Sequence, residues 1–298
     1  MASIGLSTQV LSELEPKQDF FVGIDSDGCA FDSMEIKHKE CFCPQIIKFW
    51  DLQPVSKYAR EAVEFVNLYS KLRGTNRWPA LISVLDLLRD RPEVTRRACN
   101  VPQASKVRAF ISSGLPLSND GLKAYVTAKP DPELDHAMRW SNAVNVAVAD
   151  IVHNLPPFPF VRESLELLQN KADALVVSAT PTDTLVHEWQ VWKIDHYVRA
   201  IAGQELGTKK QHLKMATAGK YKANHVLMIG DAPGDLEAAR ANSALFFPIN
   251  PGHEEQSWER FFNEGVKKFL AGNFAGAYEA SLIAEFEGLL PSTPRWKP

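Results

Sequence analysis

Short apolar runs that end in a polar residue or a glycine recur along this chain, and they constrain its fold more than any other feature. Three are clear, at residues 20–24, 174–177 and 225–229, and two weaker ones lie at 198–202 and 244–248. A run that is apolar throughout is typical of a strand covered on both faces, as in a parallel sheet.

Helical patterns separate and follow these runs. Apolar residues recur at helical spacing at 161–169, 182–192, 210–218, 234–241, 257–270 and 274–289. Alternation of strands and helices predicts an α/β fold with a doubly wound, Rossmann-like parallel sheet. Such sheets bind ligands at the carboxyl ends of their strands, near the point where the strand order reverses.

The alternation is interrupted by residues 33–157, which carry a different pattern. Helices are predicted there at 57–72, 79–89 and 132–154. Pro156 and Pro157 then prevent the last helix from continuing. The sequence therefore predicts an α/β core domain of residues 1–32 and 158–298, with a helical domain of residues 33–157 inserted into it.

Charge and hydropathy argue against two classes of partner. The 298 residues include 33 Lys and Arg and 36 Asp and Glu, a formal net charge of −3 without the basic excess of a nucleic-acid-binding surface. No apolar run approaches the roughly 18 residues of a membrane span, and residues 1–20 lack the apolar stretch of a secretory signal. We expect a cytoplasmic protein that binds neither nucleic acid nor membrane; the sequence makes no prediction of oligomeric state.

Asp25 and Asp27 directly follow the first predicted strand. Because the chain turns there, one carboxylate can attack a phosphorus atom while the other exchanges protons with the leaving group and then with water. Aspartate is a known nucleophile that forms an aspartyl-phosphate, and Gly28 permits a tight turn. Aspartates are also common in turns and helix caps, so this motif alone leaves both interpretations open.

A second acidic pair, Asp231 and Asp235, lies where another predicted strand ends and a helix begins. Carboxylate oxygens are suitable ligands for Mg²⁺, a hard cation that keeps several of its waters. Aspartates that cap the helix are the alternative interpretation.

A serine and a pair of lysines complete the candidate site. The hydroxyl of Ser178 and the backbone N–H groups that follow it, from Ala179 on, could hold a phosphate oxygen at a strand end. Serine is otherwise an ordinary turn residue. Lys209 or Lys210 could stabilise charge on a transferring phosphoryl group, or both could be solvated surface residues.

Taken in order, these four motifs resemble the haloacid dehalogenase superfamily, whose signature is Asp-x-Asp, Ser or Thr, Lys, and Gly-Asp-x-x-x-Asp. The resemblance covers about residues 18–32 and 158–248. The inserted helical domain resembles the type 1 cap of that superfamily.

The resemblance implies a role for each acidic residue. Asp25 would be the nucleophile and a ligand of Mg²⁺. Asp27 would be the general acid and then the general base, and would lend its backbone carbonyl to the metal. Asp231 would complete the protein ligands, and Asp235 would orient the lysine and the waters of the metal.

The remaining roles concern the phosphoryl group. Ser178 and Ala179 would bind its oxygens, and a lysine would stabilise its charge. We prefer Lys209 as the catalytic lysine, because Lys210 is expected to begin a helix and can point to solvent. A loose phosphoryl transition state needs this kind of positioning and charge neutralisation more than covalent help.

The expected reaction is magnesium-dependent hydrolysis of a small phosphomonoester metabolite, for example a sugar phosphate. A phosphomutase of the same superfamily shares these motifs, and a non-catalytic binding module on the same fold is the alternative from another class. Dehalogenases of the superfamily lack the second aspartate, so Asp27 argues against that activity. Since every catalytic position is filled, a binding module is disfavoured.

Substrate selection is expected to come from the inserted domain. Arg73 and Arg77 flank a glycine between two predicted helices. Their planar guanidinium groups suit an anionic or hydroxylated substrate. A surface loop with both arginines in solvent is the alternative.

Overall fold

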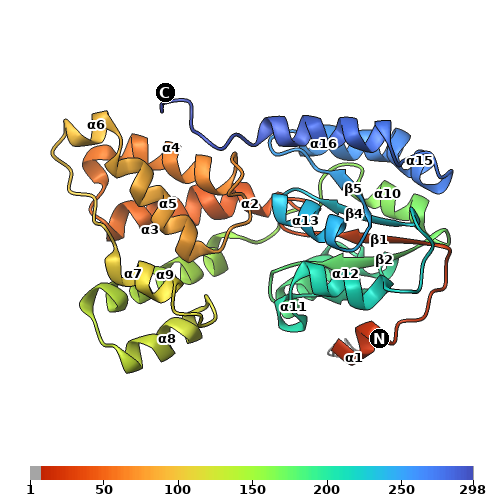
Figure 1. Ribbon diagram of the computed structural model, residues 1–298, viewed down its shortest axis with the longest axis horizontal. Coiled ribbons are helices and arrows are strands. Elements are labelled where there is room, and N and C mark those ends of the chain that lie inside the picture. Colours follow the sequence, from red (N-terminus) through yellow and green to blue (C-terminus); the bar gives the residue numbers. More distant parts are fainter. Residues whose placement is uncertain (1–7, 298) are drawn as a thin grey trace. The chain divides into compact units, whose positions relative to one another are not determined.

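The computed structural model describes residues 8–297, and within this range the strands form one five-stranded sheet with the order β3-β2-β1-β4-β5. All paired strands are parallel. They are β1 (Phe20–Ile24), β2 (Ala172–Val177), β3 (Ala200–Ala202), β4 (Val226–Gly230) and β5 (Leu245–Pro248). The chain runs from central β1 outward through β2 and β3 and then crosses to β4 and β5 (Figure 1). The doubly wound sheet predicted from the sequence is confirmed.

Both faces of the sheet are covered, which explains why the strands are apolar throughout. Alternate side chains of a strand point to opposite faces. Val22, Ile24 and Leu227 therefore pack in one core cluster, whereas Phe21 and Met228 pack in another.

Helices on either side of the inserted segment in the sequence supply these covers. Helices α10 (Val161–Leu168), α11 (Thr182–Val191), α14 (Glu254–Arg260) and α15 (Val266–Leu270) contribute to the first cluster. Helices α1 (Thr8–Ser12), α12 (Lys209–Thr217) and α13 (Pro233–Ala241) contribute to the second. Helix α16 (Ala277–Leu289) packs against β5 and contributes to both. The shorter turns are η3 (Asp195–Tyr197), η4 (Gln204–Leu206) and η5 (Phe261–Gly265).

The described chain divides into two compact units, an α/β unit of residues 8–32 and 155–290 and a helical unit of residues 33–154 and 291–297. The helical unit contains α2 (Ser33–Ile36), η1 (Lys37–Phe42), α3 (Cys43–Phe49), η2 (Gln53–Val55), α4 (Ser56–Asn67), α5 (Arg77–Arg89), α6 (Pro92–Thr95), α7 (Ser105–Ile111), α8 (Asn119–Ala128) and α9 (Pro132–Ile151). Trp78 and Trp140 are fully buried in its core, with ring centroids 5.7 Å apart. Within the described residues, no helix has the length and apolarity to cross a bilayer.

The C-terminal residues, which the sequence analysis assigned to the core domain, group with the helical unit instead. The Trp296 ring centroid lies 4.5 Å from the guanidinium carbon of Arg91, and the Tyr58 ring lies 4.3 Å from the same carbon. Arg91 is 5% exposed, so the cation–π contact with Trp296 holds the C-terminal residues against a buried charge.

The first helical stretch of this unit was not predicted, because a proline interrupts it. Residues 33–49 are helical despite Pro44, and the preceding turn is a π-helix in which the N–H of Cys43 donates to the carbonyl of His38. A π-helical turn contains one residue more than an α-helical turn, so its backbone N–H groups bond to carbonyls one residue further back. This shift lies next to Pro44, which has no N–H to donate. Helix α8 was also missed, although Ser118 caps it by accepting a bond from the N–H of Gly121 at 3.0 Å.

Candidate active site

Asp25 lies at the carboxyl end of β1, where the backbone leaves the sheet. Its N–H still donates to the carbonyl of Ile229 at 3.0 Å, so β4 fixes its position. The residue is 3% exposed, and its Oδ1 accepts a bond from the N–H of Ser26 at 2.8 Å. Gly28 has φ +73°, a value that favours glycine, and it lets the chain turn directly after the strand.

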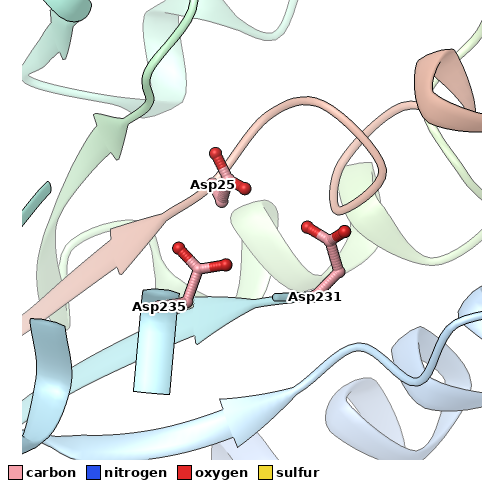
Figure 2. A group of neighbouring side chains, drawn as sticks. All are labelled: Asp25, Asp231 and Asp235. Carbon is pink, nitrogen blue, oxygen red and sulfur yellow. The ribbon is translucent and has the colours of Figure 1, made fainter. Parts of the chain in front are cut away.

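Asp231 and Asp235 bring two further carboxylates from the end of β4 and the first turn of α13. Oδ2 of Asp235 accepts a bond from the N–H of Ala232 at 3.0 Å, which caps the helix. One oxygen from each of Asp25, Asp231 and Asp235 lies within 4.8 Å of the others, and all three residues are buried. Figure 2 shows the three carboxylates gathered at the ends of β1 and β4.

Lys209 supplies a positive charge to this cluster. Its Nζ lies 2.7 Å from Oδ2 of Asp25 and 2.7 Å from Oδ1 of Asp235. It is the first residue of α12, which begins one residue earlier than predicted and is capped by the side chain of Thr208. Lys210 is exposed. The ammonium group that reaches the carboxylates is therefore that of Lys209.

The charges in the cluster perturb one another strongly. Burial opposes the charge on Lys209, but the carboxylates of Asp235, Asp25 and Asp231 outweigh it and raise the pKa of the lysine. For Asp235, burial dominates and raises the pKa to about 6, while Lys209 opposes the rise. When ionised, three carboxylates and one ammonium leave a net negative charge, which a bound cation would offset.

The donor set fits a hard divalent cation. The cluster consists of carboxylates, without thiol or imidazole. Carboxylate oxygen suits Mg²⁺, which is commonly held by one or two carboxylates and several waters. Asp25 and Asp231 could bind such an ion directly, with Asp235 holding Lys209 and the waters of the ion.

Asp27 and Ser178 are joined through a residue that the sequence analysis did not single out. Oγ1 of Thr180 donates to Oδ2 of Asp27 at 2.6 Å, and the N–H of Thr180 donates to Oγ of Ser178 at 3.2 Å. Ser178 thus forms the turn given as one interpretation of the sequence, and its hydroxyl proton can still donate to a phosphate oxygen. Ala179, next in the turn, is exposed. The signal for Thr180 was a second hydroxyl two residues after Ser178.

A close approach of backbone to side chain at the end of β4 holds Asp235 in place. A Cβ on Gly230 would lie 2.3 Å from Cγ of Asp235, so only a residue without a side chain fits there.

Gly230→Ala is therefore expected to displace the carboxylate of Asp235, lower the free energy of unfolding by about 1–3 kcal/mol and reduce activity. Urea unfolding and a phosphatase assay test this, with Gly234→Ala as the matched control, because a Cβ on Gly234 meets nothing within 4 Å. Equal effects of the two substitutions would contradict the packing argument.

The two arginines expected to select the substrate make contacts inside the helical unit. Arg73 is 3% exposed, and its guanidinium donates to the carbonyl of Leu68 at 3.0 Å. Arg77 donates to Oγ of Ser141 at 2.8 Å, lies over the ring of Phe42, and has a pKa lowered by burial. These contacts give both arginines a part in packing the unit, and their role in specificity stays a prediction.

Comparison with known proteins finds a family that part of this chain matches. A family model described as haloacid dehalogenase-like hydrolase matches residues 103–247, which include Ser178, Lys209 and the acidic pair after β4. No significantly similar curated protein was found.

Several solved structures are similar to this chain at low sequence identity. A hydrolase of the superfamily from Geobacter sulfurreducens is 16% identical over 79% of this chain and 90% of its own, with a TM-score of 0.39. A haloacid dehalogenase-like hydrolase from Xanthomonas campestris is 11% identical over 87% and 96%, with a TM-score of 0.47. A predicted phosphoglycolate phosphatase from Haemophilus somnus is 15% identical over 78% and 86%, with a TM-score of 0.45.

The family match covers most of the sheet that carries the candidate site. Residues 103–247 of this chain match the haloacid dehalogenase-like hydrolase family, and they include three of the five strands of the sheet and all but the last residue of a fourth.

Proposed function

We propose that the chain is a magnesium-dependent phosphatase that hydrolyses a small phosphomonoester through an aspartyl-phosphate on Asp25. The observation that carries the proposal is the surroundings of Asp25. Its buried carboxylate lies 2.7 Å from the Lys209 ammonium and shares a cluster with Asp231. Phosphoryl transfer depends on positioning and charge neutralisation, and this cluster supports both.

The first half of the proposed reaction transfers the phosphoryl group to the protein. An oxygen of Asp25 attacks phosphorus, and the bond from phosphorus to the ester oxygen breaks. Asp27 gives its proton to that oxygen, so the alcohol leaves neutral. Lys209 offsets charge on the transferring group, while the Ser178 hydroxyl and the Ala179 N–H hold its oxygens.

The second half returns the protein to its starting state. Asp27, now a carboxylate, takes a proton from water as the water oxygen attacks phosphorus. The bond from phosphorus to Asp25 breaks, and inorganic phosphate leaves. Mg²⁺, when bound by Asp25 and Asp231, supplies positive charge beside the phosphoryl oxygens.

We further propose that the helical unit acts as the cap that selects the substrate in a cytoplasmic enzyme. The motifs of the α/β unit handle only the phosphoryl group and its metal, so they cannot distinguish one ester from another. Phosphate release from a panel of phosphorylated metabolites with Mg²⁺ tests the function. Isomerisation of a sugar phosphate without phosphate release would identify a mutase, and no reaction with any phosphate ester would contradict the proposal.

Activity is expected to require Mg²⁺ and to be inhibited by Ca²⁺. Calcium takes more ligands at longer distances and would disturb the octahedral geometry suited to in-line attack. Rates after chelation, and after addition of each cation, give the measurement. Full activity of the exhaustively chelated protein would contradict the metal assignment.

Asp27→Asn is expected to slow both half-reactions by about 10²- to 10⁴-fold, the usual contribution of general acid–base catalysis. Because p-nitrophenolate leaves without a proton, phosphorylation by its ester should suffer less than phosphorylation by an alkyl phosphate. Single-turnover phosphorylation rates with the two esters give the comparison. Equal losses for both would argue against the acid role.

A further inference from the structure

The side chain of Asp27 accepts a hydrogen bond from a residue far away in the sequence. Oγ1 of Thr180, in the connection between β2 and α11, donates to Oδ2 of Asp27 at 2.6 Å. A short hydrogen bond from a hydroxyl to a carboxylate is among the stronger neutral–ionic contacts and restricts rotation of the carboxylate.

Thr180 is itself held firmly by its backbone. Its N–H donates to Oγ of Ser178 at 3.2 Å, and its carbonyl accepts a bond from the N–H of Gln204 at 3.0 Å. The connection also fits closely against the end of β3, because a Cβ on Gly203 would lie 2.7 Å from the Thr180 carbonyl oxygen. The hydroxyl therefore projects from a fixed point and not from a free loop.

The helix that follows Thr180 holds the same turn at a second place. Ser26 separates the two aspartates, is fully buried, and accepts a bond at Oγ from Nε1 of Trp189 at 3.0 Å. Its hydroxyl lies 3.4 Å from Oε2 of Glu188, to which it donates. One segment, from Thr180 through α11, thus supports the turn that carries Asp25 and Asp27.

We propose that Thr180 is a positioning residue for Asp27, a role that rests on the function proposed above. The hydrogen bond fixes the plane and direction of the carboxyl group, so that proton transfer to the leaving oxygen starts from one geometry. General acid catalysis needs heavy atoms within hydrogen-bond reach, and a misplacement of about 1 Å can cost about 10²-fold in rate.

Thr180→Val tests this role, because valine keeps the shape of threonine and removes only the hydroxyl function. We expect kcat for an alkyl phosphate to fall by roughly 10- to 100-fold. Phosphorylation by p-nitrophenyl phosphate should fall much less, since its leaving group needs no proton. The inhibition constant of inorganic phosphate should change little, because Thr180 positions Asp27 and does not hold the phosphoryl group. Thr180→Ser, which restores the hydroxyl, should recover most of the rate.

A matched control lies two residues further along the same segment. Oγ1 of Thr182 donates to Oε2 of Glu205 at 2.6 Å, so Thr182→Val removes a hydrogen bond of the same length to a different carboxylate. This variant should keep the wild-type dependence on leaving group. Thermal unfolding of both valine variants separates local effects from loss of fold, and Thr180→Ala replaces Thr180→Val in the comparison if the latter is unfolded.

The outcomes separate this inference from the proposed function. If wild type hydrolyses phosphate esters and Asp27→Asn is slow, but Thr180→Val behaves like Thr182→Val, the positioning role is wrong and the phosphatase stands. Equal losses with both leaving groups, or a large rise in the inhibition constant of phosphate, would likewise overturn the positioning role. A wild-type protein inactive on every phosphate ester would instead contradict the function on which the inference rests.

Discussion

Replacing Asp25 by asparagine is expected to abolish turnover and leave the fold intact. Asparagine is nearly isosteric, and its carbonyl oxygen can still accept the bond that the N–H of Ser26 makes to Oδ1. It is a poor nucleophile and a weaker ligand for a hard cation, so neither the attack on phosphorus nor the metal site survives the change. Hydrolysis of p-nitrophenyl phosphate and thermal unfolding provide the two measurements.

An exposed aspartate supplies the control for this substitution. Asp183 lies on α11 with an exposed side chain, so Asp183→Asn makes the same chemical change away from the cluster. It should retain near wild-type activity. Hydrolysis by Asp25→Asn at a rate close to that of Asp183→Asn would show that the nucleophile is another group.

Lys209→Met is expected to give the second largest loss, about 10³-fold in kcat. The arginine that stabilises the phosphoryl transition state of GTPases contributes about 10³- to 10⁵-fold, and the removal of one oxyanion-hole donor costs about 10²- to 10³-fold. The substitution should also destabilise the chelated protein by up to about 3–5 kcal/mol, because Asp25 and Asp235 would lose a buried ion-pair partner. Steady-state kinetics and thermal unfolding in a chelator measure the two effects.

The neighbouring lysine makes this a paired experiment. Lys210→Met changes the same side chain one residue further on, where it is exposed. Its activity and stability should remain close to wild type. A larger loss for Lys210→Met than for Lys209→Met would reverse the assignment of the catalytic lysine.

The α/β sheet could be predicted because its strands are buried on both faces. Burial on both sides leaves an uninterrupted apolar run such as Phe20–Ile24, and the polar residue that follows marks the carboxyl end of the strand. In a parallel sheet the carboxyl ends of the strands lie at the same edge, so the sequence alone predicts that Asp25 and Asp231 lie near each other. β3 (Ala200–Ala202) is only three residues long, which explains its weaker pattern.

Contacts between distant segments could not be predicted in the same way. Asp27 and Thr180 are 153 residues apart, and their hydrogen bond depends on how the β2–α11 connection turns over the end of β1. Nothing in the local sequence distinguishes a threonine that reaches a carboxylate from one that faces solvent. The lysine ambiguity had a similar origin, because a shift of one residue in the start of α12 decides which ammonium reaches Asp25.

The arginines illustrate a further difficulty. The loop that carries Arg73 and Arg77 contains planar donors and a glycine, which suggested a substrate contact. In the folded unit, the carbonyl of Leu68 and the hydroxyl of Ser141 accept bonds from these guanidinium groups. Every residue has a backbone carbonyl that can accept a hydrogen bond. The sequence around an arginine therefore does not show whether its guanidinium group will bond to such a carbonyl or to a substrate.

The measurement that tests the central claim most directly is the site of phosphorylation during turnover. With p-nitrophenyl phosphate as substrate, Asp27→Asn should accumulate the intermediate, because this leaving group needs no proton whereas attack of water on the aspartyl-phosphate loses its general base. Acid quenching of this variant with substrate and Mg²⁺, followed by peptide mapping by mass spectrometry, should find the phosphoryl group on Asp25. A phosphoryl group on another residue, or an unmodified Asp25 while substrate is being consumed, would contradict the account.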